Sequence, residues 1–147
     1  MDADDIIIDE MRAEDVCEAC ALWYSIPELE VARSFDTHER IRVYLTRNPG
    51  FSTVARKGDR IVGAAVCGHD GRRGSFYHVG VLPEFRRHGI AARMVERSLS
   101  CLREVGLTTA FCFTHEKNVA AQAFWRGTGW EHCPWVQYHL RDFDTER

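Results

Sequence analysis

One junction near the middle of the chain, where an apolar strand runs into a long amphipathic helix, constrains the fold most. Residues 75–82, SFYHVGVL, are rich in β-branched and aromatic side chains and stop at Pro83, which predicts a strand. Over residues 89–105 the apolar side chains recur at helical spacing on two sides, and Gly106 is a good helix terminator. A further strand-like run follows at residues 107–114. The junction therefore predicts a β-α-β crossover, in which the helix links two strands of one sheet.

The flanking segments predict a meander of strands before this helix. Two strand-like runs flank Gly58-Asp59, and a second turn at residues 69–74 leads into the strand described above. Two amphipathic helices precede the meander, joined by a mobile loop with apolar anchors at residues 25–35, and Asp36 or Thr37 is expected to cap the second helix. The expected strands are residues 5–12, 51–57, 60–69, 75–82, 107–114 and 135–143, and the expected helices are residues 12–27, 36–50, 89–105 and 118–129. The order β-α-α-β-β-β-α-β-α-β predicts an α+β fold, with a mixed, mostly antiparallel sheet flanked by helices.

The length and charge of the chain limit the functions it can have. At 147 residues, with 45% hydrophobic and 28% charged residues, it is expected to form one globular domain over residues 1–147. The net charge of −3 argues against a general nucleic-acid binder. No run approaches the ~18 apolar residues of a membrane span, and the acidic N-terminus differs from a secretory or transit peptide. We expect a cytoplasmic protein that binds neither membranes nor nucleic acid.

The cysteines and histidines show no pattern typical of a metal site. Cys17 and Cys20 form a C-x-x-C in a helical context, and no second pair stands at zinc-finger spacing. His115-Glu116 lacks the second histidine of a zinc protease, because residue 119 is a valine. The six cysteines are therefore expected to be small, buried or half-buried thiols of a reduced protein, and no metal is expected.

The stretch RRHGIA, residues 86–91, has the composition of an anion site. The first turn of a helix leaves its N–H groups unpaired and carries a partial positive charge. Gly89 permits close backbone approach there, while Arg86 and Arg87 offer charge-assisted bonds to phosphate. A solvated helix cap is the alternative, since neither of the commonest nucleotide-binding glycine loops occurs in the chain.

Two motifs resemble those of a known family. VGVLPEFRRHGIAARMVE is similar to the acetyl-CoA signature of the GNAT (GCN5-related N-acetyltransferase) superfamily, Q/R-x-x-G-x-G/A, with Arg86, Gly89 and Ala91 at the defining positions. Downstream, EKNVAAQAFWRGTGW resembles the family's second landmark, an asparagine before a short helix, which places Asn118 and Phe124 in register. The order of expected elements also agrees, so the resemblance extends over essentially the whole chain.

The resemblance implies that acetyl-CoA is the co-substrate. In such a site the N–H groups at the head of the helix bind the pyrophosphate, and the preceding strand pairs with the pantetheine arm. An N–H near Val79 or Gly80 would polarise the thioester carbonyl, and Asn118 would hold the pantetheine beside Phe124. A simple helix cap is the alternative for Asn118, and a core side chain is the alternative for Phe124. The implied cofactor-binding residues are Val79, Gly80, Val81, Arg86, Arg87, His88, Gly89, Ile90, Ala91, Ala92, Asn118 and Phe124.

Several residues on or near the strand at residues 75–82 are candidates for the acid–base chemistry. His78 and Tyr77, on the strand facing the co-substrate, are the candidate catalytic residues, because the ordinary pKa of histidine suits a base at neutral pH. His69 and Asp70 on the preceding turn are further candidates for the base, and a water-relayed base would need no single residue. A strand histidine bonded to a neighbour is the alternative for His78. Trp125 stands where many members of the family have a tyrosine acid.

The acceptor is expected to be a primary amine of a small molecule or peptide, and the protein an N-acetyltransferase acting as a monomer or homodimer. A protein lysine or N-terminal acetyltransferase and a non-catalytic acyl-CoA-binding domain are the alternatives. Phe113 stands where N-terminal acetyltransferases of this family often have a glutamate. The loop between the first two helices and the last strand would hold the acceptor, and the residues offered there are Trp23, Tyr24, Glu28, Glu30, Trp135, Gln137 and Tyr138.

Overall fold

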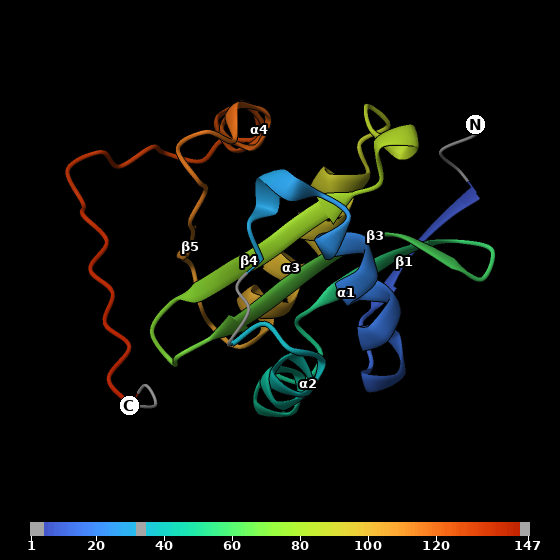
Figure 1. Cartoon of the computed structure of the whole chain (residues 1–147), viewed down its shortest axis with the longest axis horizontal. Coiled ribbons are helices and arrows are strands. Elements are labelled where there is room, and N and C mark those ends of the chain that lie inside the picture. Colours follow the sequence, from blue (N-terminus) through green and yellow to red (C-terminus); the bar gives the residue numbers. More distant parts are fainter. Residues whose placement is uncertain (1–4, 32–34, 145–147) are drawn as a thin grey trace.

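The computed structural model describes residues 5–31 and 35–144, which form a five-stranded sheet covered by helices (Figure 1). The strands are β1 (Ile6–Glu10), β2 (Thr53–Lys57), β3 (Arg60–His69), β4 (Gly74–Val81) and β5 (Ala110–Cys112). The α-helices are α1 (Val16–Tyr24), α2 (His38–Arg47), α3 (Ile90–Glu104) and α4 (Val119–Gly127), and the 3-10 turns are η2 (Ala13–Asp15), η3 (Pro27–Leu29) and η4 (Pro83–Phe85). The expected α+β class is confirmed. Among the described residues, no helix combines the length and apolar character needed to cross a bilayer.

The sheet has the order β1-β2-β3-β4-β5. The first four strands are antiparallel neighbours, and β5 joins β4 in parallel because α3 connects the two as a crossover. Helices α1 and α2 cover one face of the sheet, and α3 covers the other (Figure 1). Four of the α3 side chains chosen from helical spacing are at most 5% exposed, namely Ile90, Met94, Val95 and Leu102. The predicted crossover is therefore confirmed.

Strands β4 and β5 separate part-way along their length. Their pairing runs from Gly74 opposite Ala110 to Phe76 opposite Cys112. Beyond Phe76, β4 continues to Val81 with no strand on that side in the described part of the chain. This edge of β4 therefore presents backbone N–H and C=O groups that a strand-like ligand can pair with.

A bulge at His78 interrupts the alternation of β4. The φ angle of His78 is +53°, in the left-handed region, and the register with β3 shifts between Ala64 and Val66. Consequently Tyr77 and His78 both face α1 and α2, whereas Val79 packs on the α3 side of the sheet. Bulges commonly redirect a side chain beside a functional site, and this one places two predicted catalytic residues on one face.

The expected last strand, residues 135–143, does not form, so the prediction of a tenth element was wrong. Residues 131–144, called the C-terminal arm below, run beside β5 without joining the sheet (Figure 1). Val136, Tyr138 and Leu140 make the apolar face that the alternation indicates, yet they are 64–66% exposed. Alternation is a local property, whereas a strand also needs a neighbouring edge, and the pairing of β5 covers only three residues.

The first part of the connection between α1 and α2 packs on the core through the expected apolar anchors. Ile26 is buried, and Leu29, which ends η3, packs against the core below α1. A Cβ added to Gly80 would lie 3.0 Å from Ile26 and 3.1 Å from Leu29. The absence of a side chain at Gly80 therefore lets this turn lie directly on β4. Residues 32–34 of the connection lie outside the described residues.

Candidate active site

An exposed loop leads from β4 into α3. Phe85 and Ile90 are buried and hold its two ends, while residues 86–89 between them are exposed. Gly89 is the N-cap of α3 with a φ angle of +74°, and a Cβ added there would meet no atom within 4 Å. Glycine is thus favoured at this position for its backbone conformation and not for space. Arg87, with a φ angle of +66°, is a second residue of this loop in the left-handed region.

The N–H groups at the head of α3 are available to a ligand. Within the described chain, no hydrogen bond uses the backbone N–H of any residue from 87 to 92, and the first backbone bond runs from Arg93 N to Gly89 O at 3.0 Å. Arg86 Nε donates to Val81 O at 2.9 Å, so this guanidinium ties the loop to the end of β4. The unpaired N–H groups and the helix dipole together can bind an anion such as a pyrophosphate.

Helix α4 follows β5, the strand that separates from β4 beyond Phe76. Asn118 is 9% exposed, and its Oδ1 accepts a hydrogen bond from Ala121 N at 3.1 Å, so the side chain caps α4. Its Nδ2 donates to Glu28 O at 3.3 Å, which joins α4 to the turn after α1. His115 Nε2 and Glu30 Oε2, 3.2 Å apart, make a second link between the same two segments. Asn118 is therefore a cap and also a bridge, and Phe124 on α4 packs against Trp125 with ring centroids 5.0 Å apart.

His78 is paired with a carboxylate that the sequence did not single out as a site residue. His78 Nε2 lies 3.0 Å from Asp36 Oδ1, and the two side chains are only 13% and 8% exposed. Thr37 accepts from Arg40 N at 3.1 Å and so takes the capping role on α2, which leaves the Asp36 carboxylate to face β4. The sequence contained one signal for this role: Asp36 and Thr37 could both cap α2, and because one cap is enough, the other side chain was available for a different contact.

The pairing fixes which imidazole nitrogen of His78 can act as a base. Nε2 donates its hydrogen to the Asp36 carboxylate, so the lone pair of the neutral ring lies on Nδ1. The Trp23 ring, 5.4 Å from the His78 ring between centroids, packs against the imidazole. A carboxylate that orients an imidazole also stabilises the imidazolium formed when Nδ1 takes a proton.

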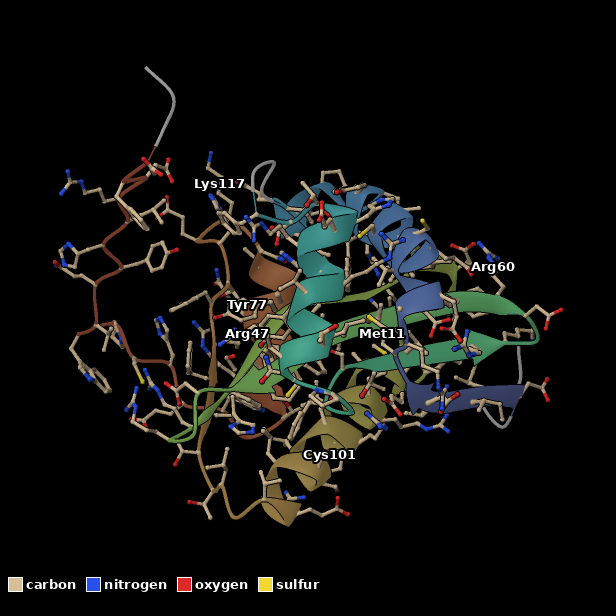
Figure 2. The ribbon with its side chains drawn as sticks, turned by 90° about the horizontal axis from the view of Figure 1, so that it is seen from below. Met11, Arg47, Arg60, Tyr77, Cys101 and Lys117 are labelled. Carbon is tan, nitrogen blue, oxygen red and sulfur yellow. The ribbon has the colours of Figure 1, made fainter. Side chains whose placement is uncertain are left out.

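A cavity of about 400 Å³ opens beside these residues. Tyr77 and His78 line it from β4, and Figure 2 shows Tyr77 next to α2. The other lining residues are Phe35, Asp36, Arg40, Ile41, Tyr44, Val66, Phe113 and Tyr138. Its volume lies in the range of small-molecule sites. A second hollow, of about 460 Å³, lies between the C-terminal half of α3 and the end of α4, and none of the predicted site residues lines it.

Only one of the residues expected to hold the acceptor lines the cavity, and that is Tyr138. Trp23 instead belongs to the core, where it is 1% exposed and donates from Nε1 to Ala64 O at 3.2 Å. Tyr24 donates to the backbone oxygen of Asp36 at 2.9 Å. Of the segments expected to hold the acceptor, the connection before α2 lines the cavity through Phe35 and the C-terminal arm lines it through Tyr138.

The alternative bases lie elsewhere in the fold. His69 Nδ1 accepts from Gly71 N at 3.0 Å, and Asp70 pairs with Arg72 at 3.1 Å, so both order the turn between β3 and β4. Neither residue lines the cavity.

Trp125, at the position of the family's tyrosine, is 8% exposed and packs among aromatic rings. Burial raises the pKa of Tyr44 in the cavity wall to about 12, so this phenol stays protonated at neutral pH.

Iodoacetamide at neutral pH should modify Cys17 and Cys133 in the folded protein and spare Cys20, Cys67 and Cys112. Cys17 and Cys133 are exposed, contrary to the expectation of buried thiols. Burial raises the pKa of Cys20 to about 11 and that of Cys67 and Cys112 to about 12, so these three remain unreactive thiols. Peptide mass spectrometry before and after denaturation in urea checks this. Equal labelling of all five in the folded state would contradict the described core.

The sequence profile of the acetyltransferase (GNAT) family matches residues 13–130. The chain belongs to this family. The acetyltransferase plu1384 of Photorhabdus laumondii is 37% identical over 86 residues, which are 58% of this chain and 59% of the relative. The match thus spans less than two thirds of the length of that relative.

Solved structures of GNAT enzymes share the fold. AAC(6')-Iy, in complex with a bisubstrate analogue of CoA and acetylneamine, aligns with a TM-score of 0.76 and 16% identity, over 94% of this chain and 99% of that chain. The ribosomal-protein-alanine N-acetyltransferase of Brucella melitensis aligns with a TM-score of 0.73 and 17% identity, over 93% and 99%. At this level of identity the likeness extends to the fold alone. Within the described residues, no three His, Cys, Asp or Glu side chains gather as a metal site.

Proposed function

We propose that this GNAT domain transfers the acetyl group of acetyl-CoA directly to a primary amine of a small molecule or peptide. The observation that carries the proposal is the head of α3, where consecutive backbone N–H groups, residues 87–92, have no partner among the described residues. They follow the end of β4, whose edge beyond Phe76 has no neighbouring strand on that side in the described part of the chain. A pyrophosphate and a strand-like arm are the two parts of a ligand that such a surface binds.

Acetyl-CoA binds along this surface in the proposed arrangement. Its pyrophosphate accepts hydrogen bonds from the N–H groups of residues 87–92, and the Arg87 guanidinium, which is exposed, adds charge. The pantetheine arm pairs with the free edge of β4 at Val79 and Val81. The acetyl group then lies near the bulge at His78, and we assign to the backbone N–H of Val79 or Gly80 the hydrogen bond to the thioester oxygen. Asn118 keeps its contacts on α4 and borders the arm from the opposite side.

The reaction needs a base, and we assign this role to His78. The amine enters the cavity beside His78, and Nδ1 takes the proton that the amine nitrogen loses as it attacks the carbonyl carbon. The new C–N bond forms, the C–S bond breaks, and the thiolate of CoA leaves. The Asp36 carboxylate stabilises the His78 imidazolium during this step. The imidazolium can then give the proton on Nδ1 to the leaving thiolate. Tyr77, beside His78, is the second group able to donate a proton there.

The proposal is tested by incubating the protein with acetyl-CoA and a panel of primary amines and peptides. We expect an acetylated product and free CoA in equal amounts, both measured by liquid chromatography and mass spectrometry. A thiol-specific dye is unsuitable, because Cys17 and Cys133 of the protein are exposed. Saturable binding of acetyl-CoA without product from any acceptor would identify a non-catalytic acyl-CoA-binding domain instead.

A further inference from the structure

We propose that the acceptor carries a single amine on an aromatic body, an inference that rests on the proposed function and narrows it. Besides Phe35, which precedes α2, the cavity beside His78 has aromatic side chains from four separate segments of the chain. Tyr44 comes from α2, Tyr77 from β4, Phe113 follows β5, and Tyr138 comes from the C-terminal arm. Side chains this far apart in the sequence meet around one space.

The rings form two pairs with geometries that leave ring faces and edges available. Tyr44 and Tyr77 meet edge to face, with centroids 6.2 Å apart and planes at 88°. Phe113 and Tyr138 are tilted at 56°, with centroids 5.1 Å apart. Aromatic rings prefer such tilted and edge-to-face contacts, and a ligand ring can extend either pair in the same way.

The rims of the cavity are apolar and open. Phe35, Phe113 and Tyr138 are 56%, 57% and 65% exposed, although each lines the cavity. These rings therefore have area to bury against a ligand, unlike Trp23 or Phe76, which are 1% exposed in the core. An apolar cavity of ~150 Å³ is enough for benzene, so a space of about 400 Å³ accommodates a ring with its side chain.

The charges around the cavity argue against an acceptor with several amines. The lining includes one carboxylate, that of Asp36, which is already paired with His78 at 3.0 Å. Apart from Asp36 and His78, the one ionisable side chain among the described lining residues that is charged at neutral pH is Arg40, which is exposed. A second ammonium group would meet Arg40 and find no further carboxylate in the described lining. Polyamines and aminoglycosides, which carry several positive charges, are therefore poor acceptors for this site.

Steady-state rates at saturating acetyl-CoA test the inference with four amines: 2-phenylethylamine, n-butylamine, spermidine and kanamycin. We expect kcat/KM for 2-phenylethylamine to exceed that for n-butylamine about tenfold or more, because ring contacts and added apolar burial both favour it. Spermidine and kanamycin should be the poorest of the four. Equal rates with all four, or a preference for kanamycin or spermidine, would overturn the inference and leave the proposed function standing.

Substitutions at exposed residues on the rim of the cavity test the inference without disturbing the folded core. Tyr138→Leu and Phe113→Leu should reduce the preference for 2-phenylethylamine over n-butylamine several-fold, because each removes a ring from the cavity wall. Trp135→Leu is the matched control: Trp135 is 70% exposed on the same arm and does not line the cavity. Arg40→Gln should raise the relative rate with spermidine. A preference unchanged in both ring variants would overturn the inference, whereas no product from any amine or peptide would overturn the proposed function itself.

Discussion

Replacing Gly89 by aspartate should weaken acetyl-CoA binding about 100-fold or more, since hydrogen bonds to charged groups are individually strong. The new carboxylate would lie at the head of α3, compete for the N–H groups of residues 87–92 and repel the pyrophosphate. Folding should survive, because aspartate tolerates the left-handed φ of +74° and is a good N-cap. Isothermal titration calorimetry measures the affinity.

Gly89→Asn is the matched control for this charge. Asparagine has nearly the same shape and tolerance of the left-handed conformation, so it should retain much of the binding that aspartate loses. Thermal denaturation gives a second readout: acetyl-CoA at a concentration that saturates the wild type should raise the Tm of the wild type and of Gly89→Asn, and raise that of Gly89→Asp much less. Full affinity in Gly89→Asp would mean that the pyrophosphate binds elsewhere.

Replacing His78 by asparagine should lower kcat by about 100-fold or more, the usual contribution of a general base. Asparagine suits the left-handed backbone at this position but has no basic nitrogen. Acetyl-CoA affinity should stay close to that of the wild type, because the proposed contacts of the pyrophosphate lie at residues 87–92. Kinetics with a good amine acceptor, together with calorimetry, separate the two effects.

Asp36→Asn provides the graded comparison. It keeps the shape of the partner 3.0 Å from His78 Nε2 but removes the charge that stabilises an imidazolium. We expect the kcat of Asp36→Asn to fall between that of the wild type and that of His78→Asn. Wild-type turnover in His78→Asn would exclude His78 as the base and favour a water-relayed mechanism.

The parts of the fold that depend on local pattern could be predicted from the sequence. The strand ending at Pro83, the glycine at position 89 and the apolar spacing of α3 are each readable within a few residues. The two motifs around Gly89 and Asn118 then indicated the family, which the profile match confirms. Local signals of this kind need no knowledge of what the segment packs against.

The parts that depend on contacts between distant segments could not be predicted. The bulge at His78 turns two consecutive side chains to one face, and the alternation of residues 75–82 shows no sign of it. Asp36 meets His78 only because α2 packs beside β4, and its sequence context suggested nothing beyond a cap. The arm at residues 135–143 has a strand pattern but pairs with no strand in the described part of the chain, so its alternation was misleading.

The most direct test of the central claim is a titration of ¹⁵N-labelled protein with acetyl-CoA, followed by the amide resonances in two-dimensional NMR spectra. The account predicts saturable shifts centred on residues 87–92, with a second group along Tyr77–Val81 where the pantetheine arm pairs with β4. The resonances of amides around the second hollow, between the C-terminal half of α3 and the end of α4, should not shift. Shifts confined to that hollow, or no saturable shift at residues 87–92, would contradict the assignment of the head of α3 as the acetyl-CoA site.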